Sequence, residues 1–326
     1  MKSILLIRDS KPPFDEGMKN VGVHYFRVLR KRFRVHSLHP KYILPKIRWI
    51  YNFKPDIIHY ISGPSFFSIL QLKIMKLMLP KSKTVLTATH PQFLGPNFIL
   101  KLLKPDIVFA QSRDIYKQFK SLSVKTTILP NGFDSKRFFP INVIEKERLR
   151  SKYSIPNEEF VLLHVGNLRI GRNLNLLYEI STHIDCYFII IASTSIKPNY
   201  ETFTSVKRLR GQIITDYVED VSEFYKLSDC YIFTPQRRPF AIDMPLSVFE
   251  AFGCGIKIVS SPYCGLPEIF KETNKLRFFT GIDDLIEILA GFKNNEIINS
   301  EVSDQIAQRD LTWESVLGQV IRFYEF

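Results

Sequence analysis

The stretch EFVLLHVGNLRIGRN, residues 159–173, joins an apolar run to a loop that carries glycines and arginines. The run Glu159–Val165 has the length and aliphatic content of a buried strand. The loop leads into a stretch with helical spacing. A strand, a glycine-containing loop and a helix in this order make up part of a βαβ unit, so this region predicts a parallel sheet.

The same alternation covers most of the chain. In the first part, strands are expected at Ser3–Arg8, Arg34–His39, Asp56–Ile61, Thr84–His90, Asp106–Gln111 and Thr126–Leu129. Helical spacing separates most of them, as in Val21–Lys31 and Phe67–Leu79. After the polar stretch Asn142–Asn157, predicted to be a linker or interdomain helix, strands are expected at Glu159–Val165, Cys186–Ala192, Gln212–Thr215, Cys230–Thr234 and Lys257–Ser260.

These elements predict an α/β fold of two Rossmann-like, doubly wound parallel-sheet domains that face each other. We place the domains at residues 1–150 and 151–326, with the last helix a candidate to return to the N-terminal domain. Ligands of such sheets bind at the carboxyl ends of the strands. The expected site is therefore the cleft between the two domains.

Basic residues are concentrated in one half of the chain. Residues 1–150 hold 28 Lys and Arg against 9 Asp and Glu, a net formal charge of +19, whereas residues 151–326 hold 17 against 23, a net charge of −6. This asymmetry indicates that the N-terminal half meets a polyanion or an anionic surface, such as nucleic acid, an acidic lipid leaflet or a phosphorylated substrate. The alternative is a solvated basic face that only aids solubility.

Several classes of protein are disfavoured by what the sequence lacks. No apolar run reaches the ~18–20 residues of a membrane-spanning helix, and Ile4–Ile7 is too short for the apolar region of a signal peptide. Four cysteines without C-x-x-C spacing predict neither a zinc site nor a disulfide framework, so a reducing cytoplasm is the default. There is no Walker A loop, no G-x-G-x-x-G after a strand and no D-x-D pair for a metal on a nucleotide diphosphate.

Two turns at predicted strand ends carry polar residues. Leu129–Asp134 contains a Pro-Asn-Gly sequence, which by itself is most often only a turn. The second turn contains Gly166, Asn167, Arg169 and Arg172. Guanidinium groups at a strand-to-helix turn suit the oxygens of a diphosphate, although two solvated arginines explain the pattern equally well.

The third turn is the most specific of the three. Arg237 and Arg238 follow a predicted strand, and Pro245 fits the first position of the next helix. The free N–H groups of that first turn are expected to bind phosphate; they belong to Leu246, Ser247 and Val248. Glu250 lies one turn further on an apolar helix and needs a partner, for which a ribose diol or a helix salt bridge would serve.

In this order and spacing, the three turns resemble the GT-B glycosyltransferases of the GT4 type, the glycosyl transferase group 1 class. Pro130–Asp134, with Phe138 and Pro140, resembles the family's PNGVD..F.P segment. Asp229–Pro235 resembles its D.yv.PS strand, and Pro245–Glu268 resembles its P...lEAmacG.pVvas..gglpE stretch. The resemblance implies retaining, metal-independent transfer of a hexosyl group from a nucleotide-sugar, UDP- or GDP-linked, with no other cofactor.

The resemblance also implies roles for residues of the C-terminal half, which would bind the donor. Glu250 matches the second of two family glutamates; Ile242 stands at the place of the first, and the adjacent Asp243 is a candidate substitute. Arg172 matches a phosphate-binding Lys/Arg position. Asn167 stands where a phosphate-binding arginine is common, and Arg169 is the candidate to compensate.

The N-terminal half would bind the acceptor. In the family the loop corresponding to Pro12–Asn20 lies beside the donor diphosphate and the acceptor, and Gly17 would allow close approach of the backbone. His90 resembles a family histidine that contacts the transferred sugar, although a single histidine at a strand end is more often structural. His59 is expected to be structural.

Basic and apolar residues also alternate in three segments of the N-terminal half, Lys41–Lys54, Phe66–Lys83 and Phe98–Lys104. Such a mixture suits contact with an anionic membrane surface. The alternative is that the apolar residues face the sheet and the lysines face water. We therefore expect a cytoplasmic enzyme, peripheral at the inner face of the cell membrane, that uses a lipid-linked or glycan acceptor.

Three other functions remain open at this stage. A nucleotide-sugar 2-epimerase shares the two-domain architecture, and a catalytically silent relative would serve as a scaffold. A nucleic-acid-binding protein would explain the charge of +19, but no nucleic-acid-binding signature is present, so no nucleic-acid partner is expected. The oligomeric state is not predicted.

Overall fold

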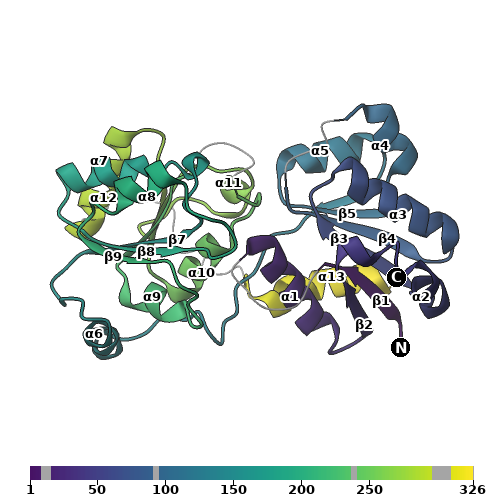
Figure 1. The fold of residues 1–326 in the computed structure, drawn as a ribbon, viewed down its shortest axis with the longest axis horizontal. Coiled ribbons are helices and arrows are strands. Elements are labelled where there is room, and N and C mark those ends of the chain that lie inside the picture. Colours follow the sequence, from purple (N-terminus) through teal and green to yellow (C-terminus); the bar gives the residue numbers. More distant parts are fainter. Residues whose placement is uncertain (9–15, 91–94, 236–240, 296–309, 326) are drawn as a thin grey trace. The chain divides into compact units, whose positions relative to one another are not determined.

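The computed structural model describes residues 1–8, 16–90, 95–235, 241–295 and 310–325. The chain divides into two compact units (Figure 1). The first comprises Met1–Asn131, Ala241–Met244 and Leu311–Phe326, and the second comprises Gly132–Phe240 and Pro245–Asp310. The N-terminal segment of the first unit ends at Asn131, earlier than the predicted boundary at residue 150, and helix α6 (Val143–Lys152) belongs to the second unit.

The first unit is built on a six-stranded parallel sheet with the strand order β2-β1-β3-β4-β5-β6. Its strands are β1 (Ser3–Ile7), β2 (Arg34–Leu38), β3 (Ile57–Ser62), β4 (Lys83–Ala88), β5 (Ile107–Ala110) and β6 (Lys125–Ile128). Its helices are α1 (Gly17–Leu29), η1 (Pro40–Tyr42), α2 (Ile47–Phe53), α3 (Phe66–Met78), α4 (Asn97–Leu103), α5 (Arg113–Ser121) and α13 (Trp313–Glu325). Figure 1 shows α3, α4 and α5 on one face of this sheet and α1 and α13 on the other.

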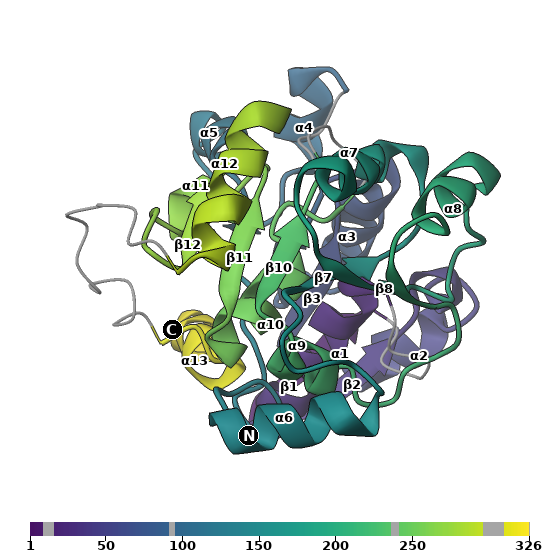
Figure 2. The same cartoon turned by 90° about the vertical axis from the view of Figure 1, so that its left-hand side faces the viewer.

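The second unit contains another six-stranded parallel sheet, with the order β12-β11-β10-β7-β8-β9. Its strands are β7 (Val161–Gly166), β8 (Tyr187–Ala192), β9 (Gly211–Ile214), β10 (Cys230–Phe233), β11 (Lys257–Ser260) and β12 (Leu276–Phe278). Its other helices are η2 (Ile170–Arg172), α7 (Asn175–His183), α8 (Tyr200–Val206), α9 (Ser222–Leu227), α10 (Leu246–Cys254), α11 (Leu266–Ile269) and α12 (Ile282–Lys293). Helices α7, α8 and α12 lie on one face and α9 and α10 on the other (Figures 1 and 2).

The prediction of an α/β chain with two doubly wound parallel sheets is confirmed. Each strand predicted from an apolar run is present, with its limits moved by a residue or two. The prediction missed β12, since its three residues include Arg277 and no apolar run marks them. No helix of the described residues is both long enough and apolar enough to cross a membrane.

A buried chain of polar groups ties the C-terminal helix to the first sheet. His59 of β3 contacts the Tyr324 hydroxyl through Nδ1, and its Nε2 lies 2.7 Å from Oγ1 of Thr87. The Tyr25 hydroxyl of α1 lies 3.2 Å from the same Thr87 oxygen. Burial lowers the pKa of His59 to about 3, so the imidazole is neutral at physiological pH and acts as a structural group.

Gly253 marks a close approach of α10 to the start of the second unit. A Cβ atom at this position would lie 2.5 Å from the Phe133 ring, a distance that real contacts do not allow. By contrast, a Cβ atom at Gly318 of α13 would meet nothing within 4 Å.

We therefore expect opposite effects from two glycine substitutions. Gly253→Ala should lower the free energy of unfolding by about 1–3 kcal/mol because the Phe133 ring must move. Gly318→Ala should raise it by about 0.5–1 kcal/mol, since alanine is the better helix former and the space is open. Urea unfolding of both variants measures the difference, and equal stabilities would contradict the proposed close contact.

Candidate functional site

The loop after β7 holds a guanidinium group at the carboxyl edge of the second sheet. Arg172 Nη1 lies 3.3 Å from the position that a Cβ atom would take on Gly166, whose φ of +158° also disfavours a side chain. Asn167 Oδ1 accepts a hydrogen bond of 3.1 Å from Arg172 Nε, and Thr234 of the neighbouring loop donates to the Arg172 carbonyl over 2.6 Å. The loop thus holds the partly buried guanidinium group of Arg172 against the backbone of Gly166.

The charge of this loop is not neutralised within the described residues. No carboxylate of the described chain lies within ion-pair distance of Arg169 or Arg172. Burial lowers the pKa of Arg172, and the positive charge of Arg169 adds to that effect. His164, within β7, donates through Nδ1 to the Ile232 carbonyl, and its buried Nε2 has no hydrogen-bond partner among the described residues. A buried cation beside an unpaired acceptor is the environment of a ligand site.

Tyr231 connects this loop to the N-terminus of α10. Its hydroxyl donates to Ser247 Oγ over 2.6 Å, and electrostatic interactions link the phenol to both Arg172 and Glu250. Burial raises the pKa of this phenol above its ordinary value, so it stays protonated and acts as a donor. Tyr231 was not among the residues that the sequence singled out, because its position in an apolar strand gives no sign of a polar role.

The N-terminus of α10 differs in two details from the prediction. Pro245 is the N-cap residue, not the first helical residue, and Val248 N–H is bonded to the Pro245 carbonyl over 3.2 Å, so it is not free. Leu246 and Ser247 N–H groups have no partner among the described residues, as predicted for a helix N-terminus. Arg237 and Arg238 lie outside the described residues.

Glu250 finds its partner in a tyrosine and not in a helix salt bridge. The buried Tyr225 hydroxyl donates to Glu250 Oε2 over 2.9 Å. Burial raises the pKa of Glu250 to about 7, although the Tyr225 hydrogen bond and the charge of Arg137 act in the opposite direction. A carboxyl group with this pKa can be either a donor or an acceptor near neutral pH.

The raised pKa of Glu250 makes stability depend on pH. The folded chain holds this proton more tightly than the unfolded chain, in which the group titrates near 4.5, so the free energy of unfolding falls as pH rises from about 4.5 to 7. We expect Glu250→Gln to gain about 2–3 kcal/mol relative to the wild type between pH 4.5 and 8. Urea unfolding across this range measures it. Glu147→Gln, at an exposed position, is the matched control, and identical profiles for all three proteins would refute the assignment.

At the carboxyl edge of the first sheet, an ion pair follows β1. Arg8 Nη2 lies 3.2 Å from Glu16 Oε2, and Glu16 caps α1 by accepting hydrogen bonds from the Met18 and Lys19 N–H groups. Gly17 begins α1, and a Cβ atom there would lie 3.4 Å from Ile242 Cδ1. This is an ordinary van der Waals distance, so the close backbone approach expected at Gly17 stays a prediction. The preceding loop residues, Pro12 to Asp15, lie outside the described residues.

His90 and Asp243 lie at this same edge. Strand β4 ends at Ala88, so His90 follows the strand and does not end it as predicted. Gly63 leaves room for His90, because a Cβ atom there would lie 2.9 Å from His90 Cβ. Burial lowers the pKa of His90, while the charges of Asp243 and Glu16 raise it.

The segment Ala241–Met244 belongs to the first unit although its neighbours in sequence belong to the second. Asp243 N–H donates to the Thr89 carbonyl over 2.8 Å, and Asn131 Nδ2 donates to the Met244 carbonyl over 2.6 Å. The predicted site residues therefore form two groups. Gly17, His90 and Asp243 meet in the first unit; Gly166, Asn167, Arg169, Arg172, Leu246, Ser247, Val248 and Glu250 lie in the second.

In the segment Phe66–Lys83, some apolar residues face the sheet and others are exposed. Ile69, Leu72 and Met75 are buried against the sheet. Other apolar residues of α3 and of α4, which pack together, are exposed and form what we call the α3–α4 apolar surface: Phe66, Phe67, Ile74, Leu77, Phe98 and Leu102. Lys73 of α3 and Lys101 of α4 lie on the same two helices. An exposed apolar area of this kind commonly marks an interaction surface.

Comparisons with known proteins agree with this architecture. The sequence model of the family described as "Glycosyl transferases group 1" matches residues 145–309. No curated protein sequence matches the chain.

Solved structures resemble the whole chain at low sequence identity. Anabaena Alr3699/HepE, in complex with UDP and glucose, is 15% identical, with a TM-score of 0.74 over 100% of this chain and 99% of that one. Sucrose-phosphate synthase from Thermosynechococcus elongatus is 13% identical, with a TM-score of 0.75 over 100% and 98%. A glycosyltransferase from Rickettsia africae is 15% identical, with a TM-score of 0.74 over 99% and 98%. The likeness shows that the fold is GT-B, as predicted.

Proposed function

Because the chain belongs to the group 1 glycosyl transferases, we propose that it moves a hexosyl group from a nucleotide-sugar to a lipid-linked or glycan acceptor, with retention of configuration and without a metal ion. The observation that carries this proposal is the unneutralised cation at the carboxyl edge of the second sheet. Arg172 lies there beside a glycine, in the same unit as the free N–H groups of α10. Guanidinium and helix N–H groups together suit a diphosphate.

The proposed chemistry needs charge stabilisation more than proton transfer by the protein. The acceptor hydroxyl attacks the anomeric carbon, the bond from that carbon to the diphosphate oxygen breaks, and the leaving diphosphate accepts the proton of the acceptor. Arg172 and the α10 N–H groups would stabilise the negative charge that develops on the diphosphate. Glu250 would bind the ribose diol of the donor. His90 and Asp243, from the first unit, would contact the transferred sugar.

UDP is the first donor nucleotide to test. The Anabaena relative has been solved with UDP and with UDP-glucose, and a donor held by backbone N–H groups and arginine needs no metal. Among the described residues, no group of three or more His, Cys, Asp or Glu side chains is arranged to hold a metal ion. We therefore propose a UDP-sugar as donor, with GDP-sugars as the alternative.

Donor binding should depend on Arg172. We expect Arg172→Gln to weaken UDP binding about 10- to 100-fold, because a charge-assisted hydrogen bond contributes about 1.5–3 kcal/mol. Arg208→Gln, an exposed arginine of the same unit, should bind UDP as the wild type does. Isothermal titration with UDP and GDP measures the affinity of both variants. Wild-type affinity in Arg172→Gln would contradict a role of Arg172 in donor binding.

The reaction products separate this proposal from its alternatives. Incubation with a UDP-sugar and lipid-extract acceptors should give UDP and a glycosylated acceptor in equal amounts. Release of a free epimerised sugar without an acceptor would indicate a 2-epimerase. Binding of no nucleotide by the folded chain would indicate a scaffold.

The first unit would bring the enzyme to a membrane-bound acceptor. Phe67, Leu77 and Phe98 are 75%, 70% and 71% exposed, and basic residues on the same helices complement anionic lipid. The net charge of +19 in residues 1–150, most of which belong to this unit, adds a longer-range attraction. We propose peripheral binding through the α3–α4 apolar surface at the cytoplasmic face of the cell membrane.

Membrane binding should require these apolar side chains. The double variant Phe67→Ser, Leu77→Ser should lose most co-sedimentation with phosphatidylglycerol vesicles, because two large side chains no longer enter the interface. Tyr200→Ser, at an 81% exposed residue of the second unit, is the matched control and should sediment as the wild type does. Wild-type binding should weaken with salt and be absent from neutral phosphatidylcholine vesicles. Equal sedimentation of the two variants would contradict this surface.

A further inference from the structure

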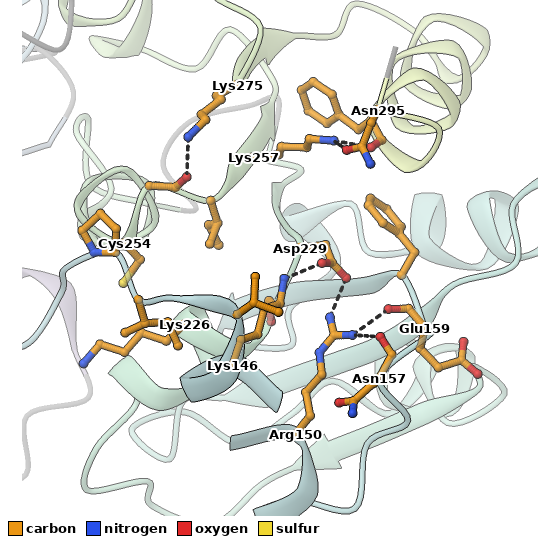
Figure 3. A pocket seen from close by; sticks show the side chains of 18 of the residues that line it. Lys146, Arg150, Asn157, Glu159, Lys226, Asp229, Cys254, Lys257, Lys275 and Asn295 are labelled. Carbon is orange, nitrogen blue, oxygen red and sulfur yellow. Dashed lines mark hydrogen bonds and ion pairs between the residues drawn. The ribbon is translucent and has the colours of Figure 1, made fainter. Parts of the chain in front are cut away.

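The second unit has a pocket of about 620 Å³ at the opposite edge of its sheet from Arg172 (Figure 3). Residues that immediately precede strands line it, such as Phe160 before β7, Asp229 before β10 and Lys275 before β12. We call it the amino-edge pocket. Helix α6 and the C-terminal ends of α10 and α12 complete its wall. Its size is that of a small-molecule site.

Cations dominate the lining of the amino-edge pocket. Its basic residues are Lys146, Arg150, Lys226, Lys257, Lys275 and Lys293. Its acidic residues are only Glu158, Glu159 and Asp229. This excess is local, because residues 132–326, which include every residue that lines the pocket, hold 22 Lys and Arg against 26 Asp and Glu, a net charge of −4.

A single carboxylate, that of Asp229, pairs with both of the α6 cations that line the pocket. Asp229 Oδ1 lies 2.5 Å from Lys146 Nζ, and its Oδ2 lies 2.7 Å from Arg150 Nη2, as Figure 3 shows. Glu159 is engaged by Arg210, which does not line the pocket. Among the described residues, no carboxylate lies at ion-pair distance from the other four lysines of the pocket, Lys226, Lys257, Lys275 and Lys293.

Three of these lysines donate to neutral oxygens, as Lys293 does to the Asp185 carbonyl over 2.8 Å, while Lys226 lies over the Phe139 ring. Lys257 Nζ donates to the Phe292 carbonyl and, over 2.7 Å, to Asn295 Oδ1, while Lys275 Nζ lies 3.3 Å from the Gly255 carbonyl. These carbonyls belong to the ends of α12 and α10, where a cation is favourable, but they do not cancel its charge. Burial lowers the pKa of Lys257; the nearby Cys230 and the charge of Asp229 raise it, and the charges of Lys146 and Lys275 lower it. Lys257 is thus within electrostatic reach of two other cations of the pocket as well as of Asp229, and a bound anion would add a further favourable partner.

We propose that the amino-edge pocket binds a soluble small molecule with two or more phosphate groups, separately from any ligand at the carboxyl edge. Lysine ammonium groups are point-charge partners for phosphate oxygens, and four of those that line the pocket have no carboxylate at ion-pair distance among the described residues. A bound polyphosphate would join α6 to the ends of α10 and α12. The site does not depend on the proposed donor or acceptor.

The test uses inorganic tripolyphosphate as the probe and the full chain at low ionic strength. Isothermal titration should show saturable binding that weakens at least tenfold in the double variant Lys257→Gln, Lys275→Gln. The matched double variant Lys197→Gln, Lys207→Gln removes two lysines of the same unit outside the pocket and should bind as the wild type does. Arg172→Gln should retain this binding, which separates it from the proposed donor site.

Two further measurements keep the result interpretable. Lys275→Glu changes an exposed side chain with one long hydrogen bond, so it should fold normally and still lose binding. Hydrogen exchange should slow at residues 142–152 when tripolyphosphate is added, which places the probe beside α6. Unchanged affinity in the pocket variants, loss of binding only in Arg172→Gln, or pocket-dependent binding of RNA without binding of tripolyphosphate would each overturn the proposal.

Discussion

Within each sheet all strands are parallel, and this single constraint decides at which edge of the sheet the polar groups of each candidate site lie. Every loop that leaves a strand emerges at the carboxyl edge, so residues far apart in sequence meet there. In the second unit this edge carries Arg172 and the N-terminus of α10. The amino edge collects helix C-termini instead, and there lysines such as Lys257 bond to helix carbonyls. One edge thus offers N–H groups, and the other offers ammonium groups.

Three separate segments of the chain form the first unit, and buried hydrogen bonds attach the second and third segments to the first. His59 is hydrogen-bonded to Tyr324 of the C-terminal helix. The segment Ala241–Met244 is held by hydrogen bonds to Asn131 and to the Thr89 carbonyl. Each bond satisfies a polar group that would otherwise be buried without a partner, at a cost of about 1–3 kcal/mol. The consequence is that Asp243 is positioned by one unit and Glu250 by the other, although only six residues lie between them.

Sequence patterns predicted the strands well because a strand covered on both faces must be apolar throughout its length. They failed for β12, a three-residue strand with an arginine at its centre. For the candidate site, the Gly166–Arg172 loop and the α10 N-terminus were recognisable from glycine, arginine and proline. The partners Tyr225 and Tyr231 were not, because tyrosines among apolar residues resemble any other core aromatic until their hydroxyl groups are placed. The Val248 N–H was predicted free but is bonded.

The sequence by itself determined the two parallel sheets, the charge asymmetry and the order of the turns, since these depend on local periodicity and residue type. The tertiary structure alone decided which groups are buried together. The raised pKa of Glu250 and the excess of cations in the amino-edge pocket both arise from side chains that distant segments bring into contact. Desolvation and electrostatic repulsion depend on distance in space, and no spacing along the chain records that distance.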